Sequence, residues 1–126
     1  MSARDIVFVV DDDPSLLRGL DRLLTAHGFQ AEVFASTEDF QQRAGPEDAL
    51  CLVLDIHLGD KSGIDFGRQL AVAGVRLPVI FITANDSEAI RRAASDVGCV
   101  AYLSKPFPGK LLIEAIEKAR AQRLPD

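Results

Sequence analysis

Short apolar runs, separated by polar and mixed stretches, recur along the chain and predict five β-strands. Each run has strand length and is rich in Val, Ile, Leu or Phe. Three runs are apolar throughout, which is typical of strands that helices cover on both faces of a parallel sheet. The second run contains Glu32 and therefore suits an edge of the sheet. The predicted strands are Ile6–Val10, Ala31–Phe34, Leu50–Leu54, Val79–Ile82 and Val100–Leu103.

A helical pattern follows every predicted strand. The first is a leucine stripe that recurs at helical spacing. His27 and Gly28 end this helix, because a cation-capable residue in the last turn followed by glycine is a helix stop. His27 is therefore interpreted as an end-of-helix residue and not as a ligand or a base. The stripe consists of Leu16, Leu17, Leu20, Leu23 and Leu24.

The other helices are predicted from their ends. Ser36 and Asp39 resemble a capping box that opens the second helix, which Gly45-Pro46 ends. The third, fourth and fifth helices are expected from about Gly63 to Ala73, from Ser87 to Gly98, and from about Gly109 to Gln122. We expect the fourth helix to bury Ala89, Ile90, Ala93, Ala94 and Val97.

Strict alternation of strands and helices predicts an α/β fold with a parallel sheet between two helical layers. For five strands, the flavodoxin-like (βα)5 order 2-1-3-4-5 is the natural candidate. Its switch point lies between the first and third strands, where ligands are expected to bind. We predict a single domain over residues 1–126, with residues 121–126 as a tail or the start of a linker.

Polar residues stand where the strands that line this switch point end. Asp13, before Pro14, is read as a helix cap. Asp11, Asp12 and Asp55 would repel one another and raise one another's pKa unless a cation neutralised them. Carboxylate oxygens favour a hard ion, so the expected cofactor is Mg²⁺, for which Mn²⁺ can substitute.

Such a site suits phosphoryl transfer to a carboxylate. Asp55 ends the central strand and is the expected nucleophile, while Asp11 and Asp12 hold the metal from one side. Thr83 and Lys105 can offer a hydroxyl and an ammonium to the phosphoryl oxygens. Ala84 is small and would leave an incoming phosphoryl group unobstructed.

Composition narrows the possible partners. The net charge of -5, with scattered basic residues, argues against direct nucleic-acid binding. No apolar run has the length of a membrane span, and no signal peptide is recognisable at the start, so we expect a cytoplasmic protein. Cys51 and Cys99 lack metal-ligand spacing and are interpreted as small apolar residues that do not pair.

The chain resembles the receiver domain of bacterial two-component response regulators over roughly Ile6 to Arg120. It is most similar to receivers of the nitrogen-fixation and nitrate type of transcription regulator. The motifs that carry the resemblance are Val9-Val10-Asp11-Asp12-Asp13, Asp55 with Gly63, Ile82-Thr83-Ala84, and Ser104-Lys105-Pro106-Phe107.

The resemblance implies a role for each of these positions. Asp55 is the phosphoacceptor, and Asp11, Asp12, Asp55 and the backbone carbonyl of His57 hold the metal. Thr83 is the switch hydroxyl, Lys105 contacts the phosphate, and Tyr102 is the aromatic switch residue, although an ordinary half-buried tyrosine fits the same pattern. The Lys105-Pro106 bond is cis in this family.

The resemblance also implies partners. A sensor histidine kinase or a small phosphodonor would supply the phosphoryl group. The output would be a partner protein or a downstream DNA-binding domain, with a possible homodimer through the fourth helix, fifth strand and fifth helix. The domain would switch conformation without acting as an enzyme on external substrates.

One departure concerns the stretch after Asp55. The family usually has proline at the fourth position, where this chain has Gly59. Glycine removes the restraint on φ, so we expect a loop that is more mobile or differently bent. With His57 and Asn85 beside the site, this leaves the lifetime of the phosphate open.

Three rival functions share the fold. A flavin carrier would need a phosphate cradle after the first strand, where this chain has three carboxylates. A phosphatase could use Asp55 as its nucleophile, but the sequence shows no obvious general acid for the leaving group and no obvious substrate-binding lid. A receiver-like docking module that never accepts phosphate is the third alternative, which the intact set of polar residues disfavours.

Overall fold

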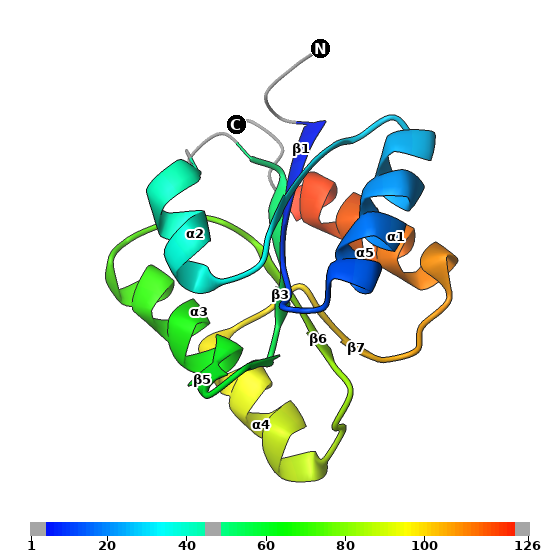
Figure 1. The fold of residues 1–126 in the computed structure, drawn as a ribbon. Helices are drawn as coiled ribbons and strands as arrows, with labels where there is room; N and C mark the ends of the chain where they lie inside the picture. The colour runs from blue at the N-terminus through cyan, green and yellow to red at the C-terminus, as the bar shows by residue number, and fades with distance from the viewer. Residues whose placement is uncertain (1–4, 45–48, 123–126) are drawn as a thin grey trace.

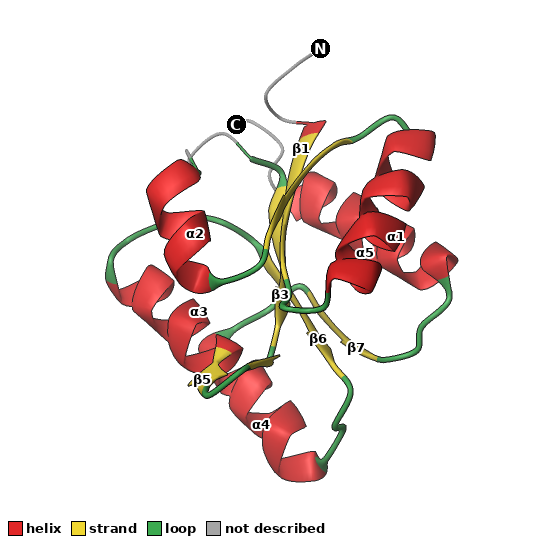
Figure 2. Cartoon of the chain, viewed as in Figure 1, coloured by secondary structure: helices red, strands yellow, loops and turns green. Residues whose placement is uncertain are grey.

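The computed structural model describes residues 5–44 and 49–122 as a five-stranded parallel sheet with helices on both faces (Figures 1 and 2). The strand order is β2-β1-β3-β6-β7, which is the expected flavodoxin-like order once two short strands, β4 and β5, are set aside. The five strands are β1 (Ile6–Val10), β2 (Gln30–Phe34), β3 (Cys51–Asp55), β6 (Val79–Thr83) and β7 (Ala101–Ser104).

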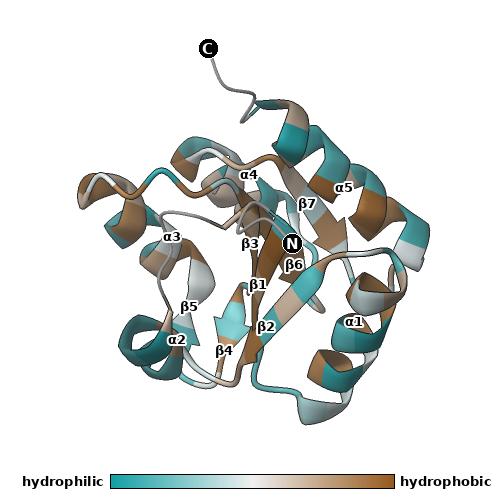
Figure 3. Cartoon of the chain, turned by 90° about the horizontal axis from the view of Figure 1, so that it is seen from above, coloured by the Kyte–Doolittle hydropathy of each residue, from teal (hydrophilic) through white to brown (hydrophobic). Residues whose placement is uncertain are grey.

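The burial of the strands follows their sequence pattern. Every residue of β3 and β6 is buried, as their uninterrupted apolar runs predict. The strand β2 has Glu32 and buries only Phe34, and it lies at an edge as expected. The other edge is β7, whose residues are all half-buried. Figure 3 shows the apolar colour concentrated on the central strands.

Five helices connect the strands. They are α1 (Pro14–Ala26), α2 (Thr37–Arg43), α3 (Gly63–Val72), α4 (Glu88–Val97) and α5 (Gly109–Gln122). Asp13 caps α1, accepting hydrogen bonds from the amides of Ser15 and Leu16. Ser36, Ser62 and Ser87 cap the next three helices with their hydroxyls. The caps predicted at Asp13, Ser36 and Ser87 are therefore confirmed.

Some predicted helix boundaries and contacts need correction. Helix α2 ends at Arg43 with Ala44 as its C-cap, directly before Gly45-Pro46, which lies outside the described residues. Residues 121 and 122, also assigned to a tail, belong to α5, while 123–126 lie outside the described residues. Ala89 is exposed, because α4 packs on the sheet through a narrow strip in which only Ala94 is fully buried.

Two apolar cores lie on opposite faces of the sheet. Helices α1 and α5 cover one face with Leu, Ile and Ala side chains. Helices α2, α3 and α4 cover the other, where Phe8, Phe34, Phe40 and Phe66 pack edge to face with ring centroids 5.2–5.9 Å apart. The sheet is thus fixed from both sides, and its strand ends form a rigid support.

A small antiparallel hairpin follows β3, at the place where a more mobile or differently bent loop is expected from Gly59. It pairs β4 (His57–Leu58) with β5 (Lys61–Ser62). Gly59 lies in its two-residue turn with φ of 64°, a value that favours glycine. We call this segment the 57–62 hairpin. It takes the chain from the end of the central strand directly into α3.

Two further features bear on the predictions from composition. Among residues 5–44 and 49–122, no helix is both long and apolar enough to span a membrane. Cys51 is buried in β3, and Cys99 is a half-buried free thiol before β7. Burial raises the pKa of the Cys99 thiol, so both cysteines fit their interpretation as small apolar residues.

Candidate functional site

The carboxyl ends of β1, β3 and β7 bring three charged side chains together. Asp11 follows β1, Asp55 ends β3 and Lys105 follows β7. The Lys105 Nζ lies 2.8 Å from Asp11 Oδ2 and 3.5 Å from Asp55 Oδ2. The Asp11 and Asp55 side chains are 0% and 5% exposed. The ammonium therefore bridges two carboxylates that are withdrawn from water.

A third carboxylate, Asp12, joins them from the exposed side. Asp11, Asp12 and Asp55 each offer an oxygen, and these atoms lie within 4.8 Å of one another. Asp11 Oδ1 accepts a hydrogen bond from the Asp13 amide at 2.9 Å, and Asp12 Oδ2 accepts one from the Gly59 amide at 3.0 Å. We call Asp11, Asp12 and Asp55 the acid cluster. The convergence predicted from topology is present.

The electrostatics of the acid cluster are unbalanced. Burial, as the larger cause, and the neighbouring Asp11 charge together raise the pKa of Asp55 to about 6, against the opposing effects of Lys105 and the His57 amide. Burial works to lower the pKa of Lys105, but its hydrogen bond to Asp11 and the attraction of both carboxylates raise it overall. One ammonium faces three carboxylates, so the cluster carries more negative than positive charge.

This donor set fits a hard divalent cation. All three side chains present carboxylate oxygens, which Mg²⁺ and Mn²⁺ prefer, and a dication would offset the excess negative charge. His57 follows closely, with its amide 3.3 Å from Asp55 Oδ1 and its side chain exposed. The imidazole thus points to solvent and leaves the backbone of His57 next to the cluster.

The carboxyl ends of β6 and β7 complete the row of strand ends around the acid cluster. Thr83 is fully buried, and its Oγ1 accepts a hydrogen bond from the Asn85 amide at 3.0 Å. The Lys105 amide donates to the Thr83 carbonyl at 2.7 Å, which ties the two strand ends together. Ala84 is exposed. The Lys105-Pro106 peptide bond is cis.

Comparison with known proteins identifies the family. The model of the response regulator receiver domain matches residues 7–117 of this chain. The chain belongs to this family. Receiver domains of response regulators are signalling switches of two-component systems, and phosphorylation of an aspartate is implied by the family.

Two curated relatives illustrate the similarity. Nodulation protein W of Bradyrhizobium diazoefficiens is 37% identical over 118 residues, which cover 94% of this chain and 52% of the relative. Response regulator protein TmoT of Ectopseudomonas mendocina is 32% identical over 114 residues, covering 90% of this chain and 52% of the relative. The receiver domain therefore spans about half the length of these relatives.

Solved structures agree on the fold. The crystal structure of FixJ-N matches with a TM-score of 0.84 and 31% identity, covering 96% of each chain. The structure of the response regulator StyR matches with a TM-score of 0.84 and 37% identity, covering 93% of this chain and 59% of StyR. The flavodoxin-like architecture predicted from the sequence is thus confirmed.

Tyr102 of the receiver domain lies in a separate polar group on the α4 side. Its hydroxyl donates to Asp86 Oδ1 at 2.9 Å, and Arg91 Nη2 lies 2.7 Å from Asp86 Oδ2. The Arg91 guanidinium carbon is 5.4 Å from the centre of the Tyr102 ring. We call Tyr102, Asp86 and Arg91 the tyrosine cluster. Among the hydrogen bonds of the described residues, none joins Tyr102 to Thr83.

Two members of this group are not predictable from the sequence. Asp86 and Arg91 were assigned no role, because nothing in their spacing distinguishes them from solvated loop and helix charges. The 57–62 hairpin was not predicted either. Gly59-Asp60 between two short segments was an available signal, since glycine at the first turn position is typical of two-residue hairpins.

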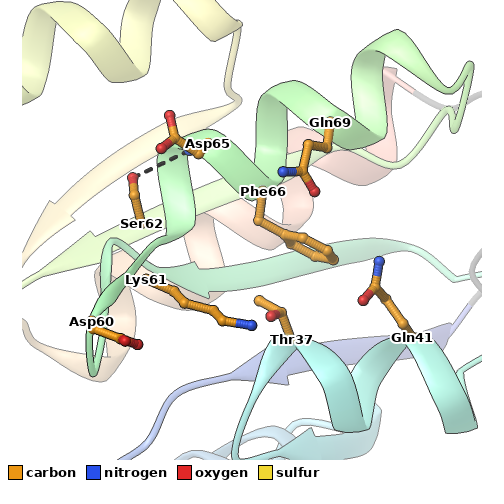
Figure 4. A pocket seen from close by; sticks show the side chains of 8 residues that line it. All are labelled: Thr37, Gln41, Asp60, Lys61, Ser62, Asp65, Phe66 and Gln69. Carbon is orange, nitrogen blue, oxygen red and sulfur yellow. Dashed lines mark hydrogen bonds between the residues drawn. The ribbon is translucent and has the colours of Figure 1, made fainter.

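The receiver domain also has a polar hollow of about 310 Å³ beside the hairpin. Figure 4 shows Gln41 of α2 and Gln69 of α3 on opposite sides, with Phe66 between them. The Ser62 hydroxyl accepts from the Asp65 amide at 3.2 Å on its rim. None of the acid cluster lines it, so the hollow is separate from the site.

Proposed function

We propose that Asp55 is the residue of this receiver domain that accepts the phosphoryl group. The observation that carries the proposal is the position of its carboxylate, buried at the end of the central strand and 3.5 Å from the Lys105 ammonium. A buried nucleophile beside a fixed cation is preorganised for a reaction in which negative charge gathers on the transferring group.

The proposed reaction needs the ionised carboxylate. An Asp55 oxygen bonds to phosphorus while the bond from phosphorus to the donor's leaving atom breaks, and the leaving group departs with that electron pair. A pKa of about 6 keeps Asp55 largely ionised at neutral pH. Lys105 neutralises charge on the phosphoryl oxygens. The product is an aspartyl phosphate in which Asp55 has given up its negative oxygen to the new bond.

The metal ligands form the second part of the proposal. Asp11, Asp12, Asp55 and the His57 carbonyl would hold Mg²⁺, with Mn²⁺ as a substitute. Support comes from the three carboxylates that offer oxygens within 4.8 Å of one another. When bound, the dication supplies charge neutralisation that one lysine alone does not provide. Asp11 and Asp12 would hold the metal from one side of the cluster.

The third part concerns the switch. Thr83 and Lys105 would contact the phosphoryl group better in one of two conformations, which shifts the population toward that state. Ala84 leaves room for the group, and Tyr102 would change orientation as the Thr83 hydroxyl moves. The Thr83 hydroxyl, buried and bonded to the Asn85 amide at 3.0 Å, would exchange that partner for a phosphoryl oxygen.

The partners belong to the proposal as well. A sensor histidine kinase or a small phosphodonor supplies the phosphoryl group, and an output protein or a DNA-binding domain responds. A homodimer through α4, β7 and α5 is the proposed phosphorylated assembly. The expected compartment is the cytoplasm. The domain would turn over only its own phosphate, and it would bind no nucleic acid itself.

Intact-mass analysis after incubation with acetyl phosphate and Mg²⁺ tests the central proposal. The wild-type chain should gain the mass of one phosphoryl group, and Asp55→Asn should gain none. Asp96→Asn, which changes an exposed α4 carboxylate in the same way, should behave as wild type. No gain by wild type would refute acceptance of phosphate from this donor. An equal gain of mass by Asp55→Asn would refute the assignment of Asp55 as the phosphoacceptor.

A further inference from the structure

Asp12 differs from the other members of the acid cluster in its exposure. Asp11 and Asp55 are buried, so their neighbours hold them in place, whereas Asp12 is exposed. An exposed carboxylate on a short side chain samples several rotamers unless a partner fixes it. In the structure, the Gly59 amide donates to Asp12 Oδ2 at 3.0 Å, between residues 47 positions apart.

The Gly59 amide is itself held firmly. The ladder of the 57–62 hairpin pairs His57 with Ser62 and Leu58 with Lys61, which places Gly59 in the turn. Leu58 is only 7% exposed and packs into the core under α2, α3 and α4. The turn is therefore anchored by a buried side chain beside it, and its amide is a fixed donor and not part of a free loop.

We propose that the Gly59 amide is a positioning group for the metal ligand Asp12, an inference that rests on the metal site of the proposed function. In the hydrogen-bonded arrangement, an oxygen of Asp12 already lies within 4.8 Å of the ligand oxygens of Asp11 and Asp55. A carboxylate can accept from an amide and still bind a cation, since it has about four lone-pair sites. Donors behind metal ligands raise affinity by orienting them.

The donor depends on the residue at position 59. Proline, the family's usual residue there, has no N–H, and its ring fixes φ near −65°. Gly59 has φ of 64° and presents its N–H to Asp12. A proline at position 59 could not make this contact. The contact makes the 57–62 hairpin part of the metal site in this chain.

A second contact links the hairpin to α2 but stands apart from Asp12. Lys61 forms an ion pair with Glu38, and both side chains are about half exposed, at 52% and 53%. A hollow of about 130 Å³ lies nearby, lined by residues that include Asp12, Gly59 and Lys61. Exposed ion pairs contribute little energy. Lys61 therefore offers a control that alters the hairpin without removing the amide.

The test is the dissociation constant for Mg²⁺, measured by isothermal titration calorimetry on the 126-residue chain. An amide-to-ester exchange at position 59, made by incorporating glycolic acid, removes the N–H and keeps glycine's freedom in φ. The dissociation constant should rise roughly three- to tenfold, the equivalent of one lost hydrogen bond. Gly59→Asn keeps the N–H and tolerates positive φ, and it should stay near wild type, as should Lys61→Met.

Each outcome separates this inference from the proposed function. Equal Mg²⁺ affinity of the ester and the wild type would overturn the positioning role alone. An equal loss of Mg²⁺ affinity in Gly59→Asn and in the ester would also overturn it. The affinity would then depend on the conformation of the turn and not on the N–H donor. A wild type that binds no Mg²⁺ would overturn both this role and the metal site, while phosphorylation of Asp55 is judged separately by mass.

A spectroscopic measurement checks the contact without metal. In a ¹H–¹⁵N spectrum of the metal-free chain, the Gly59 amide proton should move upfield in Asp12→Ala, because a charge-assisted hydrogen bond is lost. The amides of Gly74 and Gly98, which follow the C-terminal ends of α3 and α4 and are distant from Asp12 in the sequence, should not move. An unchanged Gly59 resonance would contradict the hydrogen bond and the inference built on it.

Discussion

The acid cluster and the tyrosine cluster both join carboxylates to a cation, the first where β1, β3 and β7 end and the second beside β6 and β7, but their energetics are opposite. In the acid cluster, Asp11 and Asp55 are buried and share one ammonium, so Asp55 ionises against its surroundings. In the tyrosine cluster, Asp86 has a phenol and a guanidinium as partners, and its hydrogen bonds with Tyr102 and the nearby Ser104 hydroxyl lower its pKa.

The difference shows where a ligand can act. The core imposes the geometry of the acid cluster, and a bound cation relieves an existing electrostatic cost. The tyrosine cluster has its charges paired, and Asp86 and Arg91 are exposed while Tyr102 is half-buried. Little therefore holds its geometry except its own weak bonds. One cluster is rigid and strained, while the other is relaxed and easily rearranged.

The largest effect should come from testing the rigidity behind the acid cluster. A Cβ at Gly63 would lie 2.0 Å from the Asp55 carbonyl oxygen, so Gly63→Ala must displace backbone. We expect a loss of about 3 kcal/mol in the free energy of unfolding, measured by urea denaturation.

Gly19→Ala is the matched control for this substitution. Gly19 lies within α1, and nothing stands within 4 Å of an added Cβ. The variant should gain about 0.5–1 kcal/mol, because alanine loses less backbone entropy on helix formation. If Gly63→Ala were as harmless as Gly19→Ala, the support behind Asp55 would be less rigid than described.

A smaller effect should reveal the electrostatic cost at Asp55. Its folded pKa, about 6, exceeds the ordinary value of 3.8, so ionisation opposes folding. The cost is absent below about pH 3.8, grows up to about pH 6 and stays constant above. Asp55→Asn should therefore stabilise the metal-free chain by about 2 kcal/mol at pH 7.5.

This gain should shrink as the pH falls from 6 toward 3.8, and thermal unfolding at several pH values measures it. Asp96→Asn, on the surface of α4, is the control and should show no such dependence. A destabilised Asp55→Asn at pH 7.5 without metal would mean that the carboxylate is not strained, and the contrast between the clusters would fail.

The smallest effect is expected in the tyrosine cluster. Tyr102→Phe removes the hydrogen bond to Asp86 and should cost under about 1 kcal/mol. The pKa of Asp86 should rise toward its ordinary value, as followed by carbon NMR. Because the folded pKa of Asp86 is lowered, the stability difference should be present at neutral pH and be lost in acid. An unchanged pKa would argue against the Tyr102 contact.

The strands and the acid cluster were predictable because burial on both faces leaves an unmistakable apolar run. Once β1 and β3 were placed, their carboxyl ends located Asp11 and Asp55. The parallel topology then brings these two strand ends together at the switch point. Packing depth was less predictable, as exposed Ala89 shows. Periodicity gives the face of a helix but does not say how closely that face approaches the sheet.

The contacts of Gly59 and Tyr102 could not be predicted for a different reason. Both depend on a turn conformation or a side-chain rotamer that brings an exposed group to a partner distant in sequence. Neither contact changes the pattern of hydrophobic and polar residues, so that pattern does not predict them.

The position of Tyr102 has an optical consequence. The chain has one tyrosine and no tryptophan, so its ultraviolet emission comes from a single phenol. That phenol donates a hydrogen bond to a carboxylate, Asp86, which offers a path for quenching by proton transfer in the excited state. Release of Tyr102 from Asp86 would brighten the emission. The protein thus contains a native fluorescent reporter on its α4 side, and no dye is required to follow a rearrangement there.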